Sequence, residues 1–333
     1  FKKKFEKKIE NLTNENEYKK SIIFSDFSKY FYLENKKLKL KNDKNIIDKN
    51  INIPEGYVVK INPEQKIILI NNSIILSRSP FQADGGDPLL NKPIEIGGYN
   101  NNKGGGIYII GSKSTNLFKN ILFKNLNGAI NHIFLNKFII YGAINIYSSS
   151  IELKNFSFRN ISSEDALNVV SSNFTITDGN FEDIDFDGID IDNGSGKIDN
   201  INFKNISNDG LDFSESSITV SNVSFNNIGD KAVSAGENSK INMQNLNISK
   251  SFLGIVSKDG SHVKATQVKL KDIKIPFASY IKKNEYREPN LLLNNVVADN
   301  FETLYYKDRN SKILIDNINQ KKVTKNVYDK IYK

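Results

Sequence analysis

Apolar and polar residues alternate in short runs through the middle of the chain. Ile218 and Val220 form one such run, and Val223 and Phe225 form a second run after a break. A period of two predicts β-strands, and β-branched and aromatic residues suit a pleated, half-buried surface. The Asn, Asp, Ser and Gly residues between the runs predict turns. The arrangement recurs in the two units that follow, at Ile241, Met243, Leu246 and Ile248 and at Val263, Ala265, Val268 and Leu270.

A short pattern also recurs every 22 residues between residues 164 and 260. Its copies begin at Asp165, Asp187, Asp209 and Lys231, and a fifth copy without polar ends begins at Leu253. Repetition with a period of roughly 20 to 50 residues is typical of solenoids. Because each unit holds short strands and leaves no room for a crossover helix, we expect an all-β fold. In this parallel β-helix of about 22-residue coils, each coil pairs with the next at about 4.8 Å.

Two further columns of residues run in step with this repeat. In a stacked coil, equivalent positions lie above one another, so each column has a definite place. We expect the phenylalanines to form an interior aromatic stack, at Phe158, Phe181, Phe203 and Phe225. Two residues later we expect a polar ladder at a corner, whose inward side chains cap backbone groups of the turn. That ladder consists of Asn160, Asp183, Asn205 and Asn227. We interpret both columns as structural.

The beginning and end of the pattern divide the chain into three parts. Residues 1–48 are rich in charge and are predicted to form a linker or N-terminal cap. Residues 49–300 are predicted to form the parallel β-helix, and residues 301–333 a C-terminal cap or tail. The chain starts at Phe1 without a signal-peptide profile, so we expect an upstream domain in the full-length protein.

Composition excludes several classes of site. The chain has no cysteine and only two histidines, which argues against disulfides, thiolate metal sites and a serine–histidine triad. The formal charge is +8, but lysines crowd the two ends and only four arginines are present. We therefore expect no nucleic-acid partner, because an arginine-rich stripe and a recognisable motif are missing. No apolar run reaches the ~18 residues that a membrane span needs.

The coils, the asparagine ladder and the phenylalanine stack resemble the right-handed parallel β-helix (pectate-lyase-like) superfamily over roughly residues 50–300. More narrowly, residues 164–168, 208–212, 229–237 and 257–261 resemble β-helix regions found with CotH-type kinase-like proteins of bacterial surfaces. The chain has no His-Arg-Asp or Asp-Phe-Gly motif, so phosphotransfer is not implied. The resemblance implies an extracellular, cell-surface or periplasmic location. It does not bring the Gly-His-Gly or Arg-Ile-Lys motifs of polygalacturonases, and of the pectate-lyase site only the carboxylates are present.

Three carboxylates form the one candidate centre for chemistry. Alternation places Asp190, Asp192 and Asp212 on the outside of the coil, with Asp190 and Asp212 one turn apart. Carboxylates about 5 Å apart repel, so their protonation is coupled unless a cation or base intervenes. This geometry suits a calcium ion, the one cofactor considered. It also suits the carboxyl pair of a retaining glycosidase, which lies about 5–5.5 Å apart.

Other polar residues share the repeat with this centre. Candidate ligand-binding residues on the same outer face are Asn168, Ser214, Ser234 and Lys258. Lys258 falls in the Asp192 column three turns on, about 14 Å away at standard strand spacing. The column of Asp165, Asp187 and Asp209 stands at a bend, which favours turn capping over catalysis, and Lys231 continues this column and compensates its charge.

Three functions are compatible with these features. The leading hypothesis is a surface or secreted module that binds a polysaccharide along the face from Asn168 to Lys258. The alternative is a polysaccharide lyase, epimerase or glycosidase that uses Asp190, Asp192 and Asp212. A third interpretation is a non-catalytic structural stalk.

Overall fold

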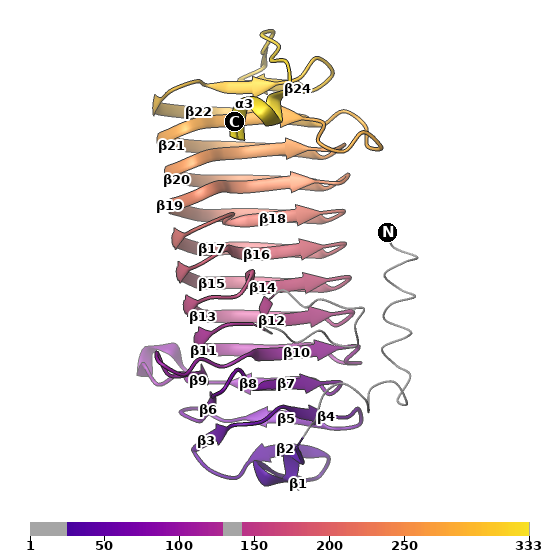
Figure 1. The fold of residues 1–333 in the computed structure, drawn as a ribbon, viewed down its shortest axis with the longest axis vertical. Coiled ribbons are helices and arrows are strands. Elements are labelled where there is room, and N and C mark those ends of the chain that lie inside the picture. Colours follow the sequence, from indigo (N-terminus) through magenta and orange to yellow (C-terminus); the bar gives the residue numbers. More distant parts are fainter. Residues whose placement is uncertain (1–24, 129–141, 333) are drawn as a thin grey trace.

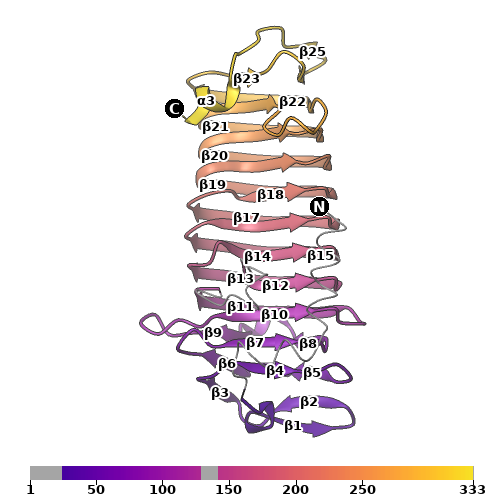
Figure 2. The same cartoon turned by 45° about the vertical axis from the view of Figure 1, so that its right-hand side comes forward.

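The computed structural model describes residues 25–128 and 142–332, which wind into a solenoid of about 12 turns (Figures 1 and 2). Parallel pairing joins each turn to the next, as between Leu167 and Ile189 or Phe203 and Phe225. The predicted all-β parallel β-helix is therefore confirmed. Residues 1–24 of the predicted N-terminal cap lie outside the described residues, as does residue 333.

Three sheet faces make up the wall of the solenoid, and we number them 1 to 3. Face 1 consists of β4 (Ile51–Ile53), β7 (Ile74–Ser77), β10 (Gly106–Ile110), β12 (Gly142–Tyr147), β14 (Asp165–Val170), β16 (Asp187–Asp192), β18 (Leu211–Ser214), the ends of β19 (Ser217–Gly236), β20 (Lys240–Lys258) and β21 (His262–Tyr280), and β23 (Tyr305–Lys307).

Faces 2 and 3 share the long strands, which bend at a corner. Face 2 consists of β1 (Phe31–Glu34), β2 (Lys37–Leu40), β5 (Val58–Ile61), β8 (Phe81–Asp84), the first parts of β11 (Asn116–Leu126), β13 (Ile151–Ile161), β15 (Asn173–Ile184), β17 (Ser195–Ile206), β19, β20, β21 and β22 (Asn290–Phe301), then β24 (Lys312–Ile315) and β25 (Ile318–Asn319). Face 3 consists of β3 (Lys44–Ile47), β6 (Lys66–Leu69), β9 (Ile94–Gly97) and the later parts of the long strands. The short helices are η1 (Phe27–Lys29), η2 (Pro88–Leu90) and α3 (Val327–Tyr332).

The interior holds the predicted aromatic stack. Phe158, Phe181, Phe203 and Phe225 are at most 1% exposed, and successive ring centroids lie 4.8, 4.9 and 5.0 Å apart. The stack continues toward the N-terminus through Phe123, whose ring centroid lies 4.7 Å from that of Phe158. Such rings bury large apolar areas and fix the register of the coils against one another.

The polar ladder lies at a corner, but its side chains do not point inward as the sequence suggested. Asn160, Asp183, Asn205 and Asn227 all have φ between 54° and 64°, and none of their side chains is buried. They bond to each other: Asn205 Nδ2 donates to Asp183 Oδ1 at 2.8 Å, and Asn227 Nδ2 donates to Asn205 Oδ1 at 2.9 Å. Left-handed backbone, which Asn and Asp tolerate, interrupts the alternation and turns these side chains outward.

Coil pairing begins before residue 49. Strand β2 pairs in parallel with β5, and β3 pairs in parallel with β6, so residues 37–47 already belong to the wall. In this segment the buried residues Leu38, Leu40 and Ile47 lie between lysines and form the alternating pattern. The sequence interpretation assigned the segment to the N-terminal cap. At the other end β24 pairs antiparallel with β25, and α3 follows.

Candidate functional site

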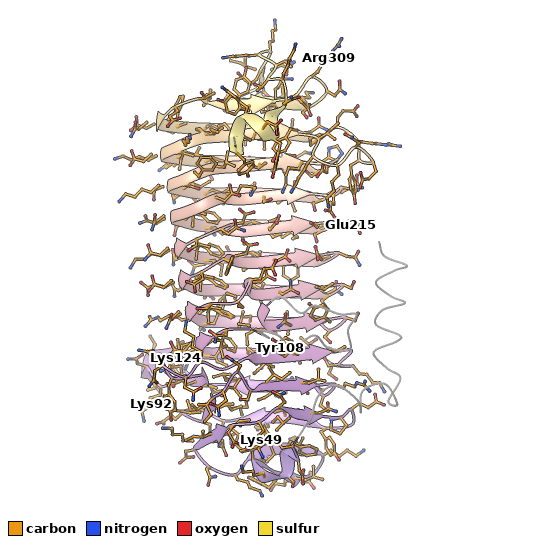
Figure 3. The ribbon with its side chains drawn as sticks, in the orientation of Figure 1. Lys49, Lys92, Tyr108, Lys124, Glu215 and Arg309 are labelled. Atoms are coloured by element: carbon orange, nitrogen blue, oxygen red, sulfur yellow. The ribbon has the colours of Figure 1, made fainter. Side chains whose placement is uncertain are left out.

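Face 1 brings the predicted residues together on consecutive turns. Asp190 pairs directly with Asp212 in the parallel register, Asn168 pairs with Asp190, and Asp212 pairs with Ser234. Adjacent strands lie about 4.8 Å apart, so these side chains form one column along the solenoid. Figure 3 shows Tyr108, which belongs to the N-terminal part of the same face. We call the outer side of this region the acidic face, defined by Asn168, Asp190, Asp192, Asp212, Ser214 and Ser234.

The two ends of this column are buried and not solvated. Asn168 is 1% exposed and Ser234 is fully buried, whereas the carboxylates between them are partly exposed. The Oδ1 atom of Asn168 and the Oγ atom of Ser234 have no hydrogen-bond partner. A buried polar atom without a partner costs free energy.

Asn168 links the carboxyl groups of Asp165 and Asp190 on neighbouring turns. Its Nδ2 atom donates to Asp165 Oδ2 at 2.9 Å and to Asp190 Oδ2 at 3.0 Å. Burial and the nearby Asp187 raise the pKa of Asp165 well above its usual range. Burial and the nearby Asp165 do the same for the pKa of Asp190, with Asp192 adding to the effect. Both shifts favour the protonated forms of these acids over their carboxylates.

Asp192 lies two residues from Asp190 on the same strand and faces the same side. Burial raises its pKa to about 6, with the charges of Asp212 and Glu237 as further causes. Its partner in the register is Ser214. The acidic face thus concentrates negative charge on two turns, which disfavours simultaneous ionisation of all its carboxyls.

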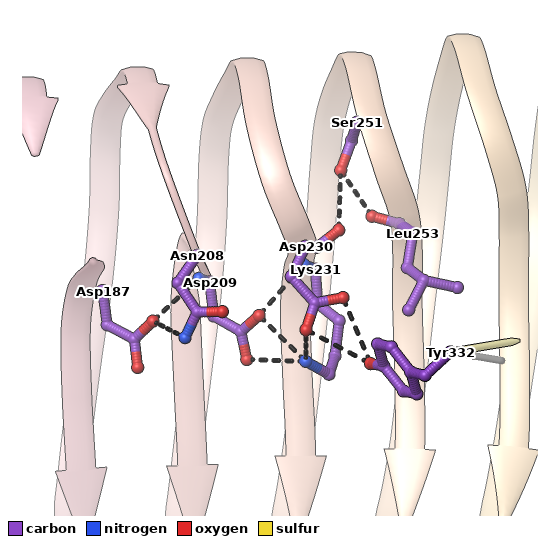
Figure 4. A network of polar contacts seen from close by, with 8 residues as sticks. All are labelled: Asp187, Asn208, Asp209, Asp230, Lys231, Ser251, Leu253 and Tyr332. Atoms are coloured by element: carbon purple, nitrogen blue, oxygen red, sulfur yellow. Dashed lines mark hydrogen bonds and ion pairs between the residues drawn. The ribbon is translucent and has the colours of Figure 1, made fainter. Parts of the chain in front are cut away.

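The column that begins at Asp165 joins turns through its side chains. Asp187 Oδ1 accepts bonds from Asn208 Nδ2 at 2.6 Å and from the Asp209 backbone N–H at 2.8 Å. Asp209 Oδ1 accepts from the Lys231 backbone N–H at 3.0 Å, and Lys231 Nζ lies 3.0 and 3.1 Å from the two Asp209 oxygens. Burial opposes the charge on Lys231, but the carboxylates of Asp209 and its neighbour raise its pKa. These contacts bridge consecutive turns, as Figure 4 shows.

A lysine approaches the acidic face from its C-terminal side. Lys258 lies one turn beyond Gly236 in the Asp192 column, and a Cβ on Gly236 would stand 3.6 Å from Lys258 Cε. The lysine stem therefore leans back over the glycine, toward the turn of Ser214. Lys258 forms no ion pair within the described part of the chain.

Tyr147 is a member of this region that the sequence interpretation missed. It is 2% exposed, and burial together with the charges of Asp165 and Asp190 raises its pKa well above the usual range. Tyr147 stands next to Val170 in the register, in the column of Asp192. The alternation of inward and outward residues from Gly142 to Tyr147 would have placed Tyr147 on this face.

A polar hollow borders the acidic face at the adjoining corner. Its volume is about 500 Å³, and its lining is almost entirely hydroxyl, amide and carboxylate groups. Asn193 follows Asp192 directly and lines it, as does Glu215, which follows Ser214 and is labelled in Figure 3. The remaining lining residues are Ser112, Ser148, Ser149, Ser150, Ser171, Ser172, Asn173, Gly194, Ser195 and Ser217.

The described residues contain no group of three or more His, Cys, Asp or Glu side chains arranged to hold a metal ion. Calcium at Asp190, Asp192 and Asp212 stays a prediction. No helix in the described ranges is long and apolar enough to cross a bilayer.

Residues 165–319 match a family model described as a right handed beta helix region. The fold is a right-handed parallel β-helix. No curated protein matches the chain. The narrower resemblance to CotH-associated regions stays a prediction.

Several solved structures are similar to this chain at low sequence identity. The catalytic domain of a GH87 α-1,3-glucanase in complex with nigerose is 14% identical (TM-score 0.47), covering 81% of this chain and 53% of that one. The periplasmic alginate epimerase AlgG is 9% identical (TM-score 0.46), covering 87% and 82%. An alginate lyase from Paenibacillus sp. str. FPU-7 is 9% identical (TM-score 0.34), covering 81% and 93%. The chain spans about half the length of the glucanase domain.

Proposed function

We propose that this protein hydrolyses glycosidic bonds in a polysaccharide, with Asp190 and Asp212 as the reacting carboxyl pair. The observation that carries this proposal is the column Asn168–Asp190–Asp212–Ser234. Two stacked carboxyl groups stand at its centre, and a buried polar atom without a partner stands at each end. A ligand that bridges this column meets hydrogen-bonding groups on both sides of a carboxyl pair.

The carboxyl pair suits general acid catalysis. A general acid has to hold its proton at the working pH, and burial achieves this for carboxyl groups in apolar or like-charged surroundings. Asp190 meets this condition because burial and the nearby carboxylates raise its pKa. Asp192, beside it on the same strand, contributes to that effect and acts as a positioning residue.

The separation of the pair favours hydrolysis with retention. Residues paired on adjacent strands lie about 4.8 Å apart, and retaining enzymes place their carboxyls about 5–5.5 Å apart. Asp190 gives its proton to the glycosidic oxygen while the Asp212 carboxylate attacks the anomeric carbon and the C–O bond breaks. Water then attacks that carbon, Asp190 takes the water proton, and Asp212 leaves as a carboxylate. One water is consumed and one new reducing end appears.

The surroundings favour a ligand rich in hydroxyl groups. The hollow next to Asp192 and Ser214 is lined by serine, asparagine and glutamate side chains and offers little apolar surface. Glycans provide many donors and acceptors for such a lining. Lys258 adds one unpaired cation at the C-terminal side of the acidic face.

The test is a reducing-end assay on a panel of neutral and uronate-containing polysaccharides. We expect wild-type protein to generate reducing ends, and Asp190→Asn or Asp212→Asn to lower the rate about 10²–10⁴-fold, as loss of an acid or base typically does. The matched control is Asp183→Asn, on the exterior corner ladder, which should keep wild-type activity. No reducing ends over the whole panel, or full activity in both variants, would refute the proposal.

Two other outcomes would identify the alternatives. Binding of a polysaccharide without cleavage, lost in an Asp190→Ala and Asp212→Ala double variant, would establish the binding module. Products with the ultraviolet absorbance of an unsaturated uronate would establish a lyase. An extracellular, cell-surface or periplasmic location stays a prediction.

A further inference from the structure

Two columns of residues on face 1 change from polar to apolar at the same turn. The column of Asn168, Asp190 and Asp212 continues through Ser234 and then becomes apolar at Val256 and Ala278. The neighbouring column becomes apolar one turn after Lys231, at Leu253 and Ile275. Outward-facing apolar residues on a solenoid wall need a cover, because they would otherwise expose hydrophobic surface to water.

The C-terminal helix α3 supplies that cover. Its Val327 and Ile331 are 3% and 6% exposed. They form one buried cluster with residues of two turns of face 1, namely Leu253, Val256, Ile275, Ala278 and Tyr280. A helix of six residues is not stable alone, so its position depends on this packing. Figures 1 and 2 both show α3 lying against the side of the solenoid near β21.

The tail that carries α3 is fixed to the last turns of the solenoid. The Thr324 backbone N–H donates to the Lys307 carbonyl at 2.8 Å, and the Lys322 backbone N–H donates to Tyr305 Oη at 3.1 Å. These two bonds hold the segment before α3 on β23. The position of α3 is therefore fixed both by its own packing and by the segment that leads into it.

Tyrosines of α3 stand where the charged column ends. Tyr332 Oη lies 3.1 and 3.2 Å from the two carboxylate oxygens of Asp230, and Lys231 Nζ lies 5.8 Å from the Tyr332 ring centroid. The Tyr328 ring is 5.0 Å from that of Tyr332, and both side chains remain more than a third exposed. Figure 4 shows the Tyr332 hydroxyl closing the row that runs from Asp187 through Asp209.

We propose that α3 is the end wall of the acidic face, so that a glycan lies with one chain end against Tyr328 and Tyr332 and is cut from that end. This inference rests on the proposed function and adds the mode of attack to it. The polar column has only Ser234 between the carboxyl pair and the first covered residue, Val256. A chain continuing past the pair along the solenoid therefore meets α3 after about two turns, or roughly 10 Å.

The product pattern tests the wall. On the polysaccharide that the reducing-end assay identifies, wild-type protein should release products of a single short length from the first minutes, with little loss of viscosity. Val327→Asp combined with Ile331→Asp removes the apolar contacts of α3 and should give a mixture of lengths and a rapid fall in viscosity. The control is Lys330→Ala on the exposed side of α3, which should keep the wild-type pattern.

A thiol probe reports the position of α3 independently of any substrate, because the chain has no cysteine. A Val256→Cys thiol should resist a maleimide at least tenfold better than a Val297→Cys thiol, since Val256 is fully buried and Val297 is 61% exposed. The double aspartate change should remove this protection.

The outcomes separate the two proposals. The end-wall proposal is wrong if the wild-type protein yields products of mixed length from the start. It is also wrong if the thiol assay shows that α3 has been released and the product pattern nevertheless stays unchanged. If no polysaccharide is cut, the proposed function fails and the mode of attack fails with it, whereas mixed product lengths from an active protein would reject the wall alone. Equal labelling of the Val256→Cys and Val297→Cys thiols would reject the position of α3 itself, and protection lost on release of α3 would support that position.

Discussion

Asp209 and Lys231 occupy equivalent positions on consecutive turns, and Lys231 Nζ lies 3.0 Å from Asp209 Oδ1 in an almost fully buried ion pair. The lysine also bonds Asp230 of its own turn. The pair ends a row of stacked acids with a cation, where a further carboxylate would add repulsion. It also stands between the acidic face and α3, so it connects the proposed chemistry to the proposed wall.

Breaking this pair should destabilise the protein strongly. Lys231→Met leaves the Asp209 carboxyl buried without its cation, and removal of one partner of a buried pair typically costs about 3–5 kcal/mol. Urea unfolding followed by circular dichroism measures the loss. The control is Lys204→Met, whose pair with Glu182 is 2.7 Å long but has side chains 58% and 32% exposed, so it should cost under about 1 kcal/mol. Equal losses in the two variants would contradict the structural role of the buried pair.

The aromatic stack should contribute more to stability than an exposed ring. Phe203→Ala opens a cavity between Phe181 and Phe225, and such a truncation costs about 3–5 kcal/mol. Phe186→Ala, where the side chain is 50% exposed, should stay within about 0.5 kcal/mol. Unfolding midpoints in guanidinium chloride would compare the two. A small effect at Phe203 would mean that the coils do not depend on the stack for their cohesion.

Stability should fall as the pH rises through the range where the acidic carboxyls ionise. Burial raises the pKa values of Asp187 and Asp192 to about 6, from the ordinary value of 3.8. Between about pH 4 and 6 the folded chain therefore binds more protons than the unfolded chain, so the unfolding free energy decreases with pH. We expect a higher melting temperature at pH 4.5 than at pH 7 in scanning calorimetry. Asp192→Asn should reduce this difference, and a stability that rose over this interval would oppose the assignment.

Removal of divalent cations should leave the proposed hydrolysis unchanged. The mechanism draws its proton and its nucleophile from Asp190 and Asp212, and no step passes through a cation. Reducing-end assays with and without EDTA would compare the rates. A loss of activity that calcium restores would instead support calcium at Asp190, Asp192 and Asp212, and isothermal titration with calcium would then give its stoichiometry.

The periodic features could be predicted from the sequence because residues one turn apart in the chain stack next to one another. A separation of 22 residues was enough to place Asp190 beside Asp212 and Phe203 beside Phe225. Alternation also placed Asp192 on the side of Asp190. These inferences need only strand geometry, which is the same in every turn.

Features outside the repeat could not be predicted in this way. The burial of Asn168 and Ser234 departs from the solvated face that alternation suggests. The cover over Val256 comes from α3, about 70 residues further along the chain, and no period connects the two. The inward orientation expected for the corner ladder was wrong because alternation fails where the backbone adopts positive φ, as at Asn205.

The stacked turns have one more consequence, for how such a protein can change over generations. Each turn contacts chiefly the turn before and the turn after, so a 22-residue segment behaves as a unit that can be gained or lost whole. A tandem duplication of residues 187–208 would insert a second copy of Asp190 and Asp192 beside the first, with every distant turn undisturbed. The reach of the reactive surface is thus a matter of copy number, which a single recombination event can alter.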